Sequence, residues 1–460
     1  MTRYTSATEQ DRERMLAEVG VSSIEELFKD IPEGVRLDRP LDLPDGLPEE
    51  HVYERLAALA SRNTSAEDEI SFLGAGMYDH YVPAIVDSIT QRSEFLTPYT
   101  PYQPEISQGT LQAMFEFQTA ISELTGLPVA SAGLYEGPSS VAAAAYLARG
   151  ATGRSKFLVS RGLHPHSRES LQTYSAGYGT TMEEIPLADG ATDLAALEQA
   201  VDDETAAVFL QQPNFLGSVE DLAALAPVAK RTGALLVVGV DALTLGVLRP
   251  PGEFGADVAV GEGQQLGNRL DFGGPSVGFF AAREEHIRRM PGRIAGETTD
   301  VDGRRGFVLT LQTREQHIRR EKATSNICTS QQQNALAAVI YLSWLGRRGI
   351  VEIGELMAQR TAYAREQLAA LEGVEPLHAR PVVREFAVRL DAPVEAVLRR
   401  CAADGVNAGF ALGAAYPEHA DGLLVAITER RSREHIDRLA EVLGRAVAAE
   451  REGVKKAVKA

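Results

Sequence analysis

Cysteine and lysine are scarce in this sequence of 460 residues. Its two cysteines, Cys328 and Cys401, cannot form a disulfide framework or a zinc site built from several cysteines. A reduced, cytoplasmic compartment is therefore expected. Any chemistry that needs an amine must also draw on a very short list of lysines: Lys29, Lys156, Lys230, Lys322, Lys455, Lys456 and Lys459.

Net positive charge and long apolar runs are also lacking. The formal net charge is −18, which argues against nucleic acid as the main partner and against binding to an anionic membrane surface. The most apolar stretch, residues 234–248, contains Asp241 and is too short to cross a bilayer. The first 16 residues have no apolar segment of the secretory type. We expect a protein that binds neither nucleic acid nor membranes.

Apolar runs of strand length alternate with helical stretches between about residues 71 and 283. The runs are short and mostly continuous, which is typical of strands buried on both faces of a sheet. They cover residues 156–160, 181–185, 206–211, 235–240, 258–261 and 278–282. This alternation predicts an α/β fold with a largely parallel sheet.

Three parts are expected along the chain. Residues 1–65 are predicted to be helical or extended, residues 66–345 to form a large α/β domain, and residues 346–460 to form a small C-terminal α/β domain. In the last part the pattern predicts strands near 385–390 and 422–427 and a final helix over 433–449.

Two places could bind a ligand at the edge of the predicted sheet. Asp241 ends a buried strand, where parallel sheets bind ligands, so it could pair with a pyridinium nitrogen or act as a local helix cap. Ser139 and Ser140 follow Gly137 before an alanine-rich helix, and could hold a phosphate or cap that helix. His164 and His166 do not predict a metal site, because no third ligand accompanies them.

A proline-rich strip at residues 97–105 contains two tyrosines, a glutamine and a glutamate. Its three prolines restrict the backbone, so Tyr99, Tyr102, Gln103 and Glu105 are presented at a low entropic cost. The strip is either a binding element or a rigid connector.

Four long strings resemble the glycine dehydrogenase (decarboxylating) family, the P-proteins of the glycine cleavage system. The strings are Phe72–Pro83, Glu94–Gly109, Gln211–Phe215 and Leu311–Thr329, so the resemblance extends over most of the chain. It implies a fold type I pyridoxal-phosphate-dependent architecture, with a mainly parallel large domain and a smaller C-terminal α/β domain.

The resemblance also implies a reaction and partners. In this family glycine forms a Schiff base with pyridoxal phosphate and loses CO2, and the aminomethyl group passes to the lipoyl group of the H-protein. Some members are one chain with two homologous halves, and others are split into subunit 1 and subunit 2. The length and the strings are similar to subunit 1, which implies a complex with glycine dehydrogenase subunit 2, expected as a two-plus-two assembly.

The cofactor lysine of the family precedes a glycine-rich loop that ends in Gly-Gly-Pro. Counting back from Gly273-Gly274-Pro275 by the family spacing reaches Gln264, and an amide cannot form an imine. We interpret the chain as the half without its own cofactor, with pyridoxal phosphate on the partner subunit. Asp241, Ser139 and Ser140 would then be vestigial. The loop at 134–140 also departs from the family pattern, which more often has Asp-Gly followed by alanine and threonine.

Three hypotheses follow. In the first, Tyr99, Tyr102, Gln103 and Glu105 help to complete the active site of the partner. In the second, the chain is a purely structural pseudoenzyme that stabilises the partner. The third, a self-sufficient transaminase, is disfavoured by Gln264. We call residues 97–105 the tyrosine strip. That its tyrosines are retained favours the first hypothesis.

Overall fold

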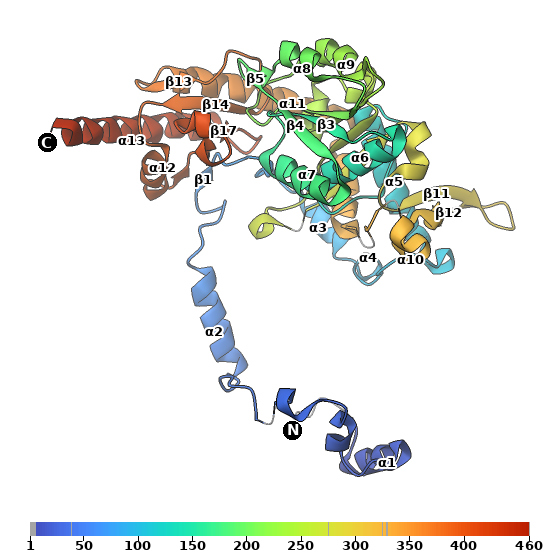
Figure 1. Ribbon diagram of the computed structural model, residues 1–460. Helices are drawn as coiled ribbons and strands as arrows, with labels where there is room; N and C mark the ends of the chain where they lie inside the picture. The colour runs from blue at the N-terminus through green and yellow to red at the C-terminus, as the bar shows by residue number, and fades with distance from the viewer. Residues whose placement is uncertain (1–5, 38, 275, 324, 328–329, 460) are drawn as a thin grey trace. The chain divides into compact units, whose positions relative to one another are not determined.

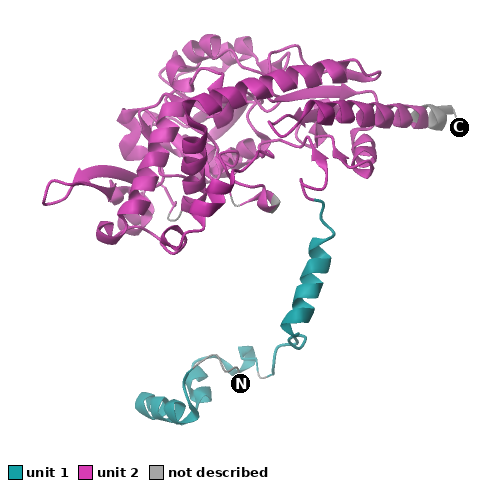
Figure 2. Ribbon diagram, turned by 180° about the vertical axis from the view of Figure 1, so that it is seen from behind, with its two compact units in different colours: residues 1–64 teal, residues 65–460 magenta. Residues whose placement is uncertain are grey.

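The computed structural model describes residues 6–37, 39–274, 276–323, 325–327 and 330–459. Pro275 of the glycine-rich loop, and Thr324, Cys328 and Thr329 of the fourth string, lie outside the described residues. The chain divides into two compact units, Met1–Thr64 and Ser65–Ala460 (Figure 2).

The first unit consists of short helices, none of which buries a residue: α1 (Glu9–Val19), the 3-10 helices η1 (Ile24–Phe28) and η2 (Glu33–Val35), and α2 (Glu49–Ala60). Thr8 and Asp11 cap the start of α1 reciprocally, because each side chain bonds the backbone N–H of the other. Residue periodicity favours an amphipathic helix over residues 22–28, but η1 is a single 3-10 segment. Five residues are too few to nucleate an α-helix without packing.

A seven-stranded sheet forms the centre of the second unit (Figure 1). The strand order is β2-β10-β9-β8-β7-β3-β4, and β10 runs antiparallel to both of its neighbours while the strands from β9 to β4 are parallel. The strands are β2 (Val129–Ala130), β3 (Lys156–Ser160), β4 (Thr181–Ile185), β7 (Thr205–Gln212), β8 (Leu235–Val240), β9 (Val258–Glu262) and β10 (Gly278–Ala282). All six predicted strands of this sheet are confirmed.

Helices cover both faces of this sheet (Figure 1). One face packs against α5 (Gln108–Thr125), α8 (Leu194–Ala200), α9 (Leu222–Lys230) and part of α11 (Gln332–Ala369), and the other against α6 (Gly137–Thr152) and α7 (Pro165–Tyr178). Successive residues of β8 point to opposite cores: Leu236 and Val238 to the first and Val237 to the second. Burial on both faces is why central strands such as β8 and β10 are continuous apolar runs, while the edge strand β4 is more exposed.

A four-stranded antiparallel sheet lies in the C-terminal part, in the order β13-β14-β17-β16. Its elements, with the helices that pack on them, are β13 (Val374–Pro376), β14 (Glu385–Leu390), α12 (Val394–Ala403), β16 (Phe410–Ala411), β17 (Gly422–Ala426) and α13 (Arg433–Lys459). The prediction that the last helix ends at residue 449 is wrong. Helix formers surround Gly453, and one glycine costs only about 1 kcal/mol.

Helix α11 connects the regions of the two sheets. Gly346 has φ of 60° and interrupts the helical backbone there, at the first residue of the predicted C-terminal domain. Residues on α11 contribute both to the core of the seven-stranded sheet and to that of the four-stranded sheet. Both sheets belong to one compact unit, and the boundary between residues 345 and 346 stays a prediction.

Shorter elements complete the second unit. They are β1 (Ile70–Ser71), α3 (Ala84–Thr90), α4 (Ser93–Leu96), β5 (Leu187–Ala188), β6 (Ala191–Thr192), β11 (Ile294–Thr299), β12 (Arg305–Thr310), α10 (Gln316–Arg319) and β15 (Val406–Asn407). We call residues Phe72–Pro83, between β1 and α3, the strap. Its first residue bonds the backbone of Asn407 and Ala426, so the strap starts at the C-terminal sheet. No helix in the described part of the chain has the length and apolar character needed to cross a membrane.

Candidate functional site

Asp241 and Gln264 lie at the same edge of the large sheet. Asp241 directly follows β8, and Gln264 follows the end of β9, the neighbouring parallel strand. Gln265 joins them, because its Nε2 donates to Asp241 Oδ1 over 3.2 Å. The carboxyl ends of parallel strands are where α/β sheets bind ligands, so this edge is the candidate site.

Every polar hydrogen-bonding group of the Gln264 side chain has a partner. Its Oε1 accepts from the Tyr78 N–H at 2.9 Å, and its Nε2 donates to the carbonyl oxygens of Tyr78 and Asn268 at 3.2 and 2.8 Å. The side chain is buried. Gln264 therefore fastens the middle of the strap to the edge of the large sheet.

Asp241 pairs with a cation of the chain itself. Arg384 Nη2 lies 2.5 Å from Asp241 Oδ2, while Asp241 Oδ1 accepts from the Leu243 N–H. Arg384 is 2% exposed, and its guanidinium carbon lies 3.3 Å from the centroid of the Tyr78 ring. The expectation of a local cap is confirmed at Leu243, and the structure adds a buried ion pair from the residue that precedes β14.

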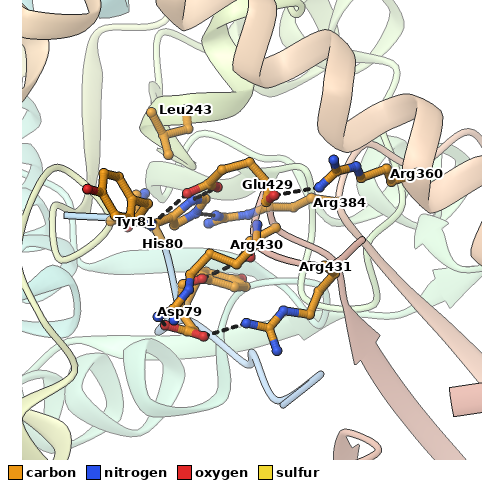
Figure 3. Close-up of polar contacts among 12 residues, drawn as sticks. Asp79, His80, Tyr81, Leu243, Arg360, Arg384, Glu429, Arg430 and Arg431 are labelled. Atoms are coloured by element: carbon orange, nitrogen blue, oxygen red, sulfur yellow. Dashed lines mark hydrogen bonds and ion pairs between the residues drawn. The ribbon is translucent and has the colours of Figure 1, made fainter. Parts of the chain in front are cut away.

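His80 extends this ion pair toward the end of the C-terminal sheet (Figure 3). Arg384 Nη1 lies 2.6 Å from His80 Nε2, and His80 Nδ1 lies 2.5 Å from Glu429 Oε2. Arginine can only donate, so Nε2 accepts and the Nδ1–H donates to Glu429. Burial opposes ionisation of Glu429, but the bonds from His80 and the Tyr81 N–H outweigh it and lower its pKa. The four side chains from Asp241 to Glu429 form one buried polar chain.

A second ionic contact holds the strap next to this chain. Asp79 accepts from Arg430 Nη1 at 2.5 Å and from Arg431 Nη2 at 2.7 Å (Figure 3). Its carbonyl oxygen also accepts from the Thr428 hydroxyl. The strap is thus bonded to the residues that follow β17 as well as to the large sheet.

Glu385, the first residue of β14, is the buried carboxyl group of the site. It accepts from the Ala75 N–H and from the Tyr78 hydroxyl, both at 2.8 Å. Burial raises its pKa to about 7. A Cβ atom on Gly74 would lie 2.4 Å from Glu385 Oε1, so this position of the strap requires glycine.

The pKa of Glu385 predicts a pH-dependent stability. Its value in the folded chain, about 7, exceeds the ordinary 4.5, so the folded state keeps a proton that the unfolded state releases in this interval. The stabilisation is fully present below pH 4.5, and roughly 3 kcal/mol is lost as the pH rises through 7. Glu385→Gln should remove this loss, as measured by urea unfolding at about pH 5 and about pH 8.

The control is Glu395→Gln, which changes an exposed carboxylate on α12 and should keep the pH dependence of the wild type. Parallel pH profiles for wild type and Glu385→Gln would contradict the assignment.

Hydrogen bonds within the protein use all the donors at the start of α6. The Gly137 N–H donates to Glu262 Oε2 at 3.0 Å, the Ser139 N–H donates to the Glu136 side chain, and the Ser140 N–H donates to the Glu136 carbonyl oxygen. Both serine hydroxyls also donate to that carbonyl oxygen. Ordinary capping, the alternative to phosphate binding, is what the structure shows here.

Both ring nitrogens of His164, in the His164-Pro165-His166 sequence, make contacts within the protein. His164 Nε2 lies 2.9 Å from the Ala75 carbonyl oxygen, its Nδ1 accepts from the His166 N–H, and burial lowers its pKa to about 4. Within the described residues, one cluster has the spacing for a metal: Asp257, Glu285 and His286. The Asp257 carboxylate already pairs with Lys230 and Arg283.

The tyrosine strip lies on the surface of the second unit. Tyr99 is 79% exposed and lines a cavity of about 270 Å³ with α5 and the start of α11, and Gln103 and Glu105 are exposed. Tyr102 is 40% exposed. Its hydroxyl donates to Glu315 Oε2 at 3.3 Å and accepts from Arg293 Nη2 at 3.1 Å. The Tyr102 hydroxyl is therefore bonded to a separate arginine–carboxylate pair and not to Asp241 or Gln264.

Sequence reasoning misses five charged or titratable residues of this site: His80, Glu262, Arg384, Glu385 and Glu429. His80 and Glu262 lie inside segments that the sequence singles out, but neither receives a role there. The one local signal for the others is the charged run Glu429-Arg430-Arg431 directly after a predicted strand.

Comparison with known proteins gives a consistent result. A family model described as "Glycine cleavage system P-protein" matches residues 2–443. A protein of Carboxydothermus hydrogenoformans named "Probable glycine dehydrogenase (decarboxylating) subunit 1" is 51% identical over 442 residues, which cover 96% of this chain and 99% of that protein.

Two solved structures agree with the fold. The crystal structure of a glycine decarboxylase (P-protein) of the glycine cleavage system, in inhibitor-bound form, has a TM-score of 0.89 and 44% identity, and covers 97% of this chain and 100% of that chain. A glutamate decarboxylase of Lactobacillus brevis has a TM-score of 0.69 at 13% identity, over 91% of this chain and 97% of that one. The second likeness concerns the fold alone. The predicted fold class, that of fold type I pyridoxal-phosphate-dependent enzymes, is confirmed.

Proposed function

The chain belongs to the glycine cleavage system P-protein family, and we propose that it acts as subunit 1 of a heteromeric glycine dehydrogenase (decarboxylating). With subunit 2 it takes part in the decarboxylation of glycine and the transfer of the aminomethyl group to the lipoyl group of the H-protein. Pyridoxal phosphate supplies the electron sink for this reaction when it is bound, and we assign it to subunit 2. The chain is not active alone, the assembly is two-plus-two, and it works in the cytoplasm, in keeping with its two cysteines.

One observation carries the proposal that this chain has no cofactor of its own. Gln264 follows β9 at the ligand-binding edge, and its amide is bonded to Tyr78 and Asn268. An imine with pyridoxal phosphate needs a lysine amine. Lys156 and Lys230 are held elsewhere, by Asp202 and by Asp257. The residues at this edge therefore do not fit a covalently bound cofactor.

Borohydride reduction tests the assignment. The full-length chain, incubated with pyridoxal phosphate, should stay colourless, and peptide mapping after reduction should find no stoichiometric phosphopyridoxyl-lysine. The complex with subunit 2 is the positive control, and its label should map to subunit 2 alone. A stoichiometric label on this chain, at Lys322 or elsewhere, would overturn the assignment.

We further propose that the tyrosine strip contributes to the working site of subunit 2. Tyr99, Gln103 and Glu105 are exposed and so are accessible to a partner surface, while Tyr102 is oriented by Arg293 and Glu315. The alternative is a purely structural subunit, for which an exposed strip needs no function. Substitution of the tyrosines distinguishes the two.

A further inference from the structure

We propose that the cofactor pocket of this subunit is closed by its own side chains, so that it excludes the cofactor independently of the missing lysine. The inference rests on the proposed function, which assigns pyridoxal phosphate to subunit 2. It goes further, because it concerns the places where the phosphate and the pyridine ring of the cofactor would lie, as well as the position of the missing lysine amine.

Glu262 and Glu136 take the place of a phosphate at the start of α6. A helix N-terminus binds phosphate through the free N–H groups of its first turn. Here Gly137 donates to Glu262 and Ser139 to the side chain of Glu136, Pro138 has no N–H, and Ser140 donates within the helix. A phosphate would find no free backbone donor in this turn, and it would face two carboxyl groups that repel its charge.

Glu262 is held firmly in this position. Its Oε1 accepts from the N–H groups of Gln264 and Val277 at 3.0 and 3.3 Å, so both of its oxygens are bonded to backbone N–H groups. A Cβ atom on Gly137 would lie 3.2 Å from the Glu262 backbone and side chain. The carboxyl group therefore fills the space between the end of β9 and the start of α6.

Arg384 takes the place of a pyridinium ring at Asp241. The Asp241 carboxylate could hold a ring N–H, but its Oδ2 lies against Arg384. Its Oδ1 accepts from the Leu243 N–H and from Gln265 Nε2. The guanidinium carbon of Arg384 lies over the Tyr78 ring, 3.3 Å from its centroid. A pyridinium placed here would displace a buried cation, which would leave Arg384 without its counter-charge.

The residues that close the pocket come from parts of the chain that are distant in sequence. Arg384 precedes β14 of the C-terminal sheet, Asp241 directly follows β8 of the large sheet, and His80 and Tyr78 belong to the strap. Opening the pocket for a ligand would break the buried chain that runs from Asp241 to Glu429. The ion pair that occupies Asp241 therefore also belongs to the chain of contacts that holds the three parts together.

Pyridoxamine phosphate is the probe that separates a closed pocket from one that merely lacks a lysine, because it already carries an amine and needs no imine. The full-length wild-type chain, titrated with it by equilibrium dialysis, should show no saturable binding below about 1 mM. Saturable binding of pyridoxamine phosphate to the wild type would overturn the closed pocket and leave the proposed function standing. A phosphopyridoxyl-lysine on this chain, formed with pyridoxal phosphate in the borohydride experiment above, would overturn both.

A pocket-opening variant gives the complementary result. Glu262→Ala/Arg384→Met removes the carboxyl group bonded to the Gly137 N–H and the guanidinium paired with Asp241 Oδ2, so affinity for pyridoxamine phosphate should rise at least about tenfold. The control Glu395→Ala/Arg389→Met changes an exposed carboxylate and an exposed arginine and should not bind. If circular dichroism shows that the double variant is unfolded, Glu262→Ala alone is titrated with the same expectation. A folded opened variant that binds no better than wild type would overturn the role of these side chains.

Discussion

Glycine–bicarbonate exchange by the assembled complex falls about ten- to a hundredfold when Tyr102 of this chain is replaced by phenylalanine. The substitution keeps the ring and removes only the hydroxyl, so folding is retained. That hydroxyl lies between Arg293 and Glu315, which fix its direction. A hydrogen bond made to the reacting groups of the partner, and lost in the variant, is worth roughly 1–3 kcal/mol. Tyr99→Phe should act in the same direction.

Tyr363→Phe is a matched control. The Tyr363 hydroxyl also lies between an arginine and a carboxylate, with Arg433 donating to it and Asp437 accepting from it, but it belongs to α11 and not to the strip. Its loss should leave the exchange rate unchanged. Rates within about twofold of wild type for Tyr99→Phe, Tyr102→Phe and the double variant would leave the chain with a structural role only.

Arg384→Met should lower the free energy of unfolding of the chain by about 3–5 kcal/mol, because it leaves the Asp241 carboxylate in the protein without a counter-charge. The methionine also loses the contact of the guanidinium with the Tyr78 ring and its bond to His80. Urea unfolding of the full-length chain measures the change.

Arg389→Met is the control, on the same strand β14 but exposed, and should change stability by less than about 0.5 kcal/mol. Adding Asp241→Asn to Arg384→Met removes the uncompensated charge and should recover part of the loss, so the two single effects should not add. A loss below about 1 kcal/mol for Arg384→Met would show that the ion pair does not hold the site.

The large sheet could be predicted because its strands are buried on both faces, which leaves continuous apolar runs such as β8 in the sequence. Gln264 could be found because the chain has few lysines and the family spacing points to one position. The polar chain through Arg384 could not be found this way. His80 and Glu429 are 349 residues apart, and single buried charges follow no periodic pattern that relates one to the other.

Short elements and helix ends are harder to predict than long apolar strands. The segment around η1 has an amphipathic pattern, yet without a packing surface within its unit it forms only a 3-10 segment. Glu262 lies in the glycine-rich sequence at the end of β9, where nothing local assigns it a role, and its partner Gly137 is 125 residues away. Ser139 and Ser140 show the same limit. Their sequence is compatible with phosphate binding and with helix capping, and the capping bonds to Glu136 can be seen only in the structure.

Helix α11 connects the two sheets of this subunit through packed side chains. After the interruption at Gly346, its turns bury Ile350 and Met357 in the core of the large sheet and, further along, Ala364 and Leu368 in the core of the C-terminal sheet. The connection between the two sheets is therefore a helical segment that is packed into a core at each end, and not a flexible linker. Because this segment packs into both cores, we expect the two sheets to move together and not as independently hinged domains.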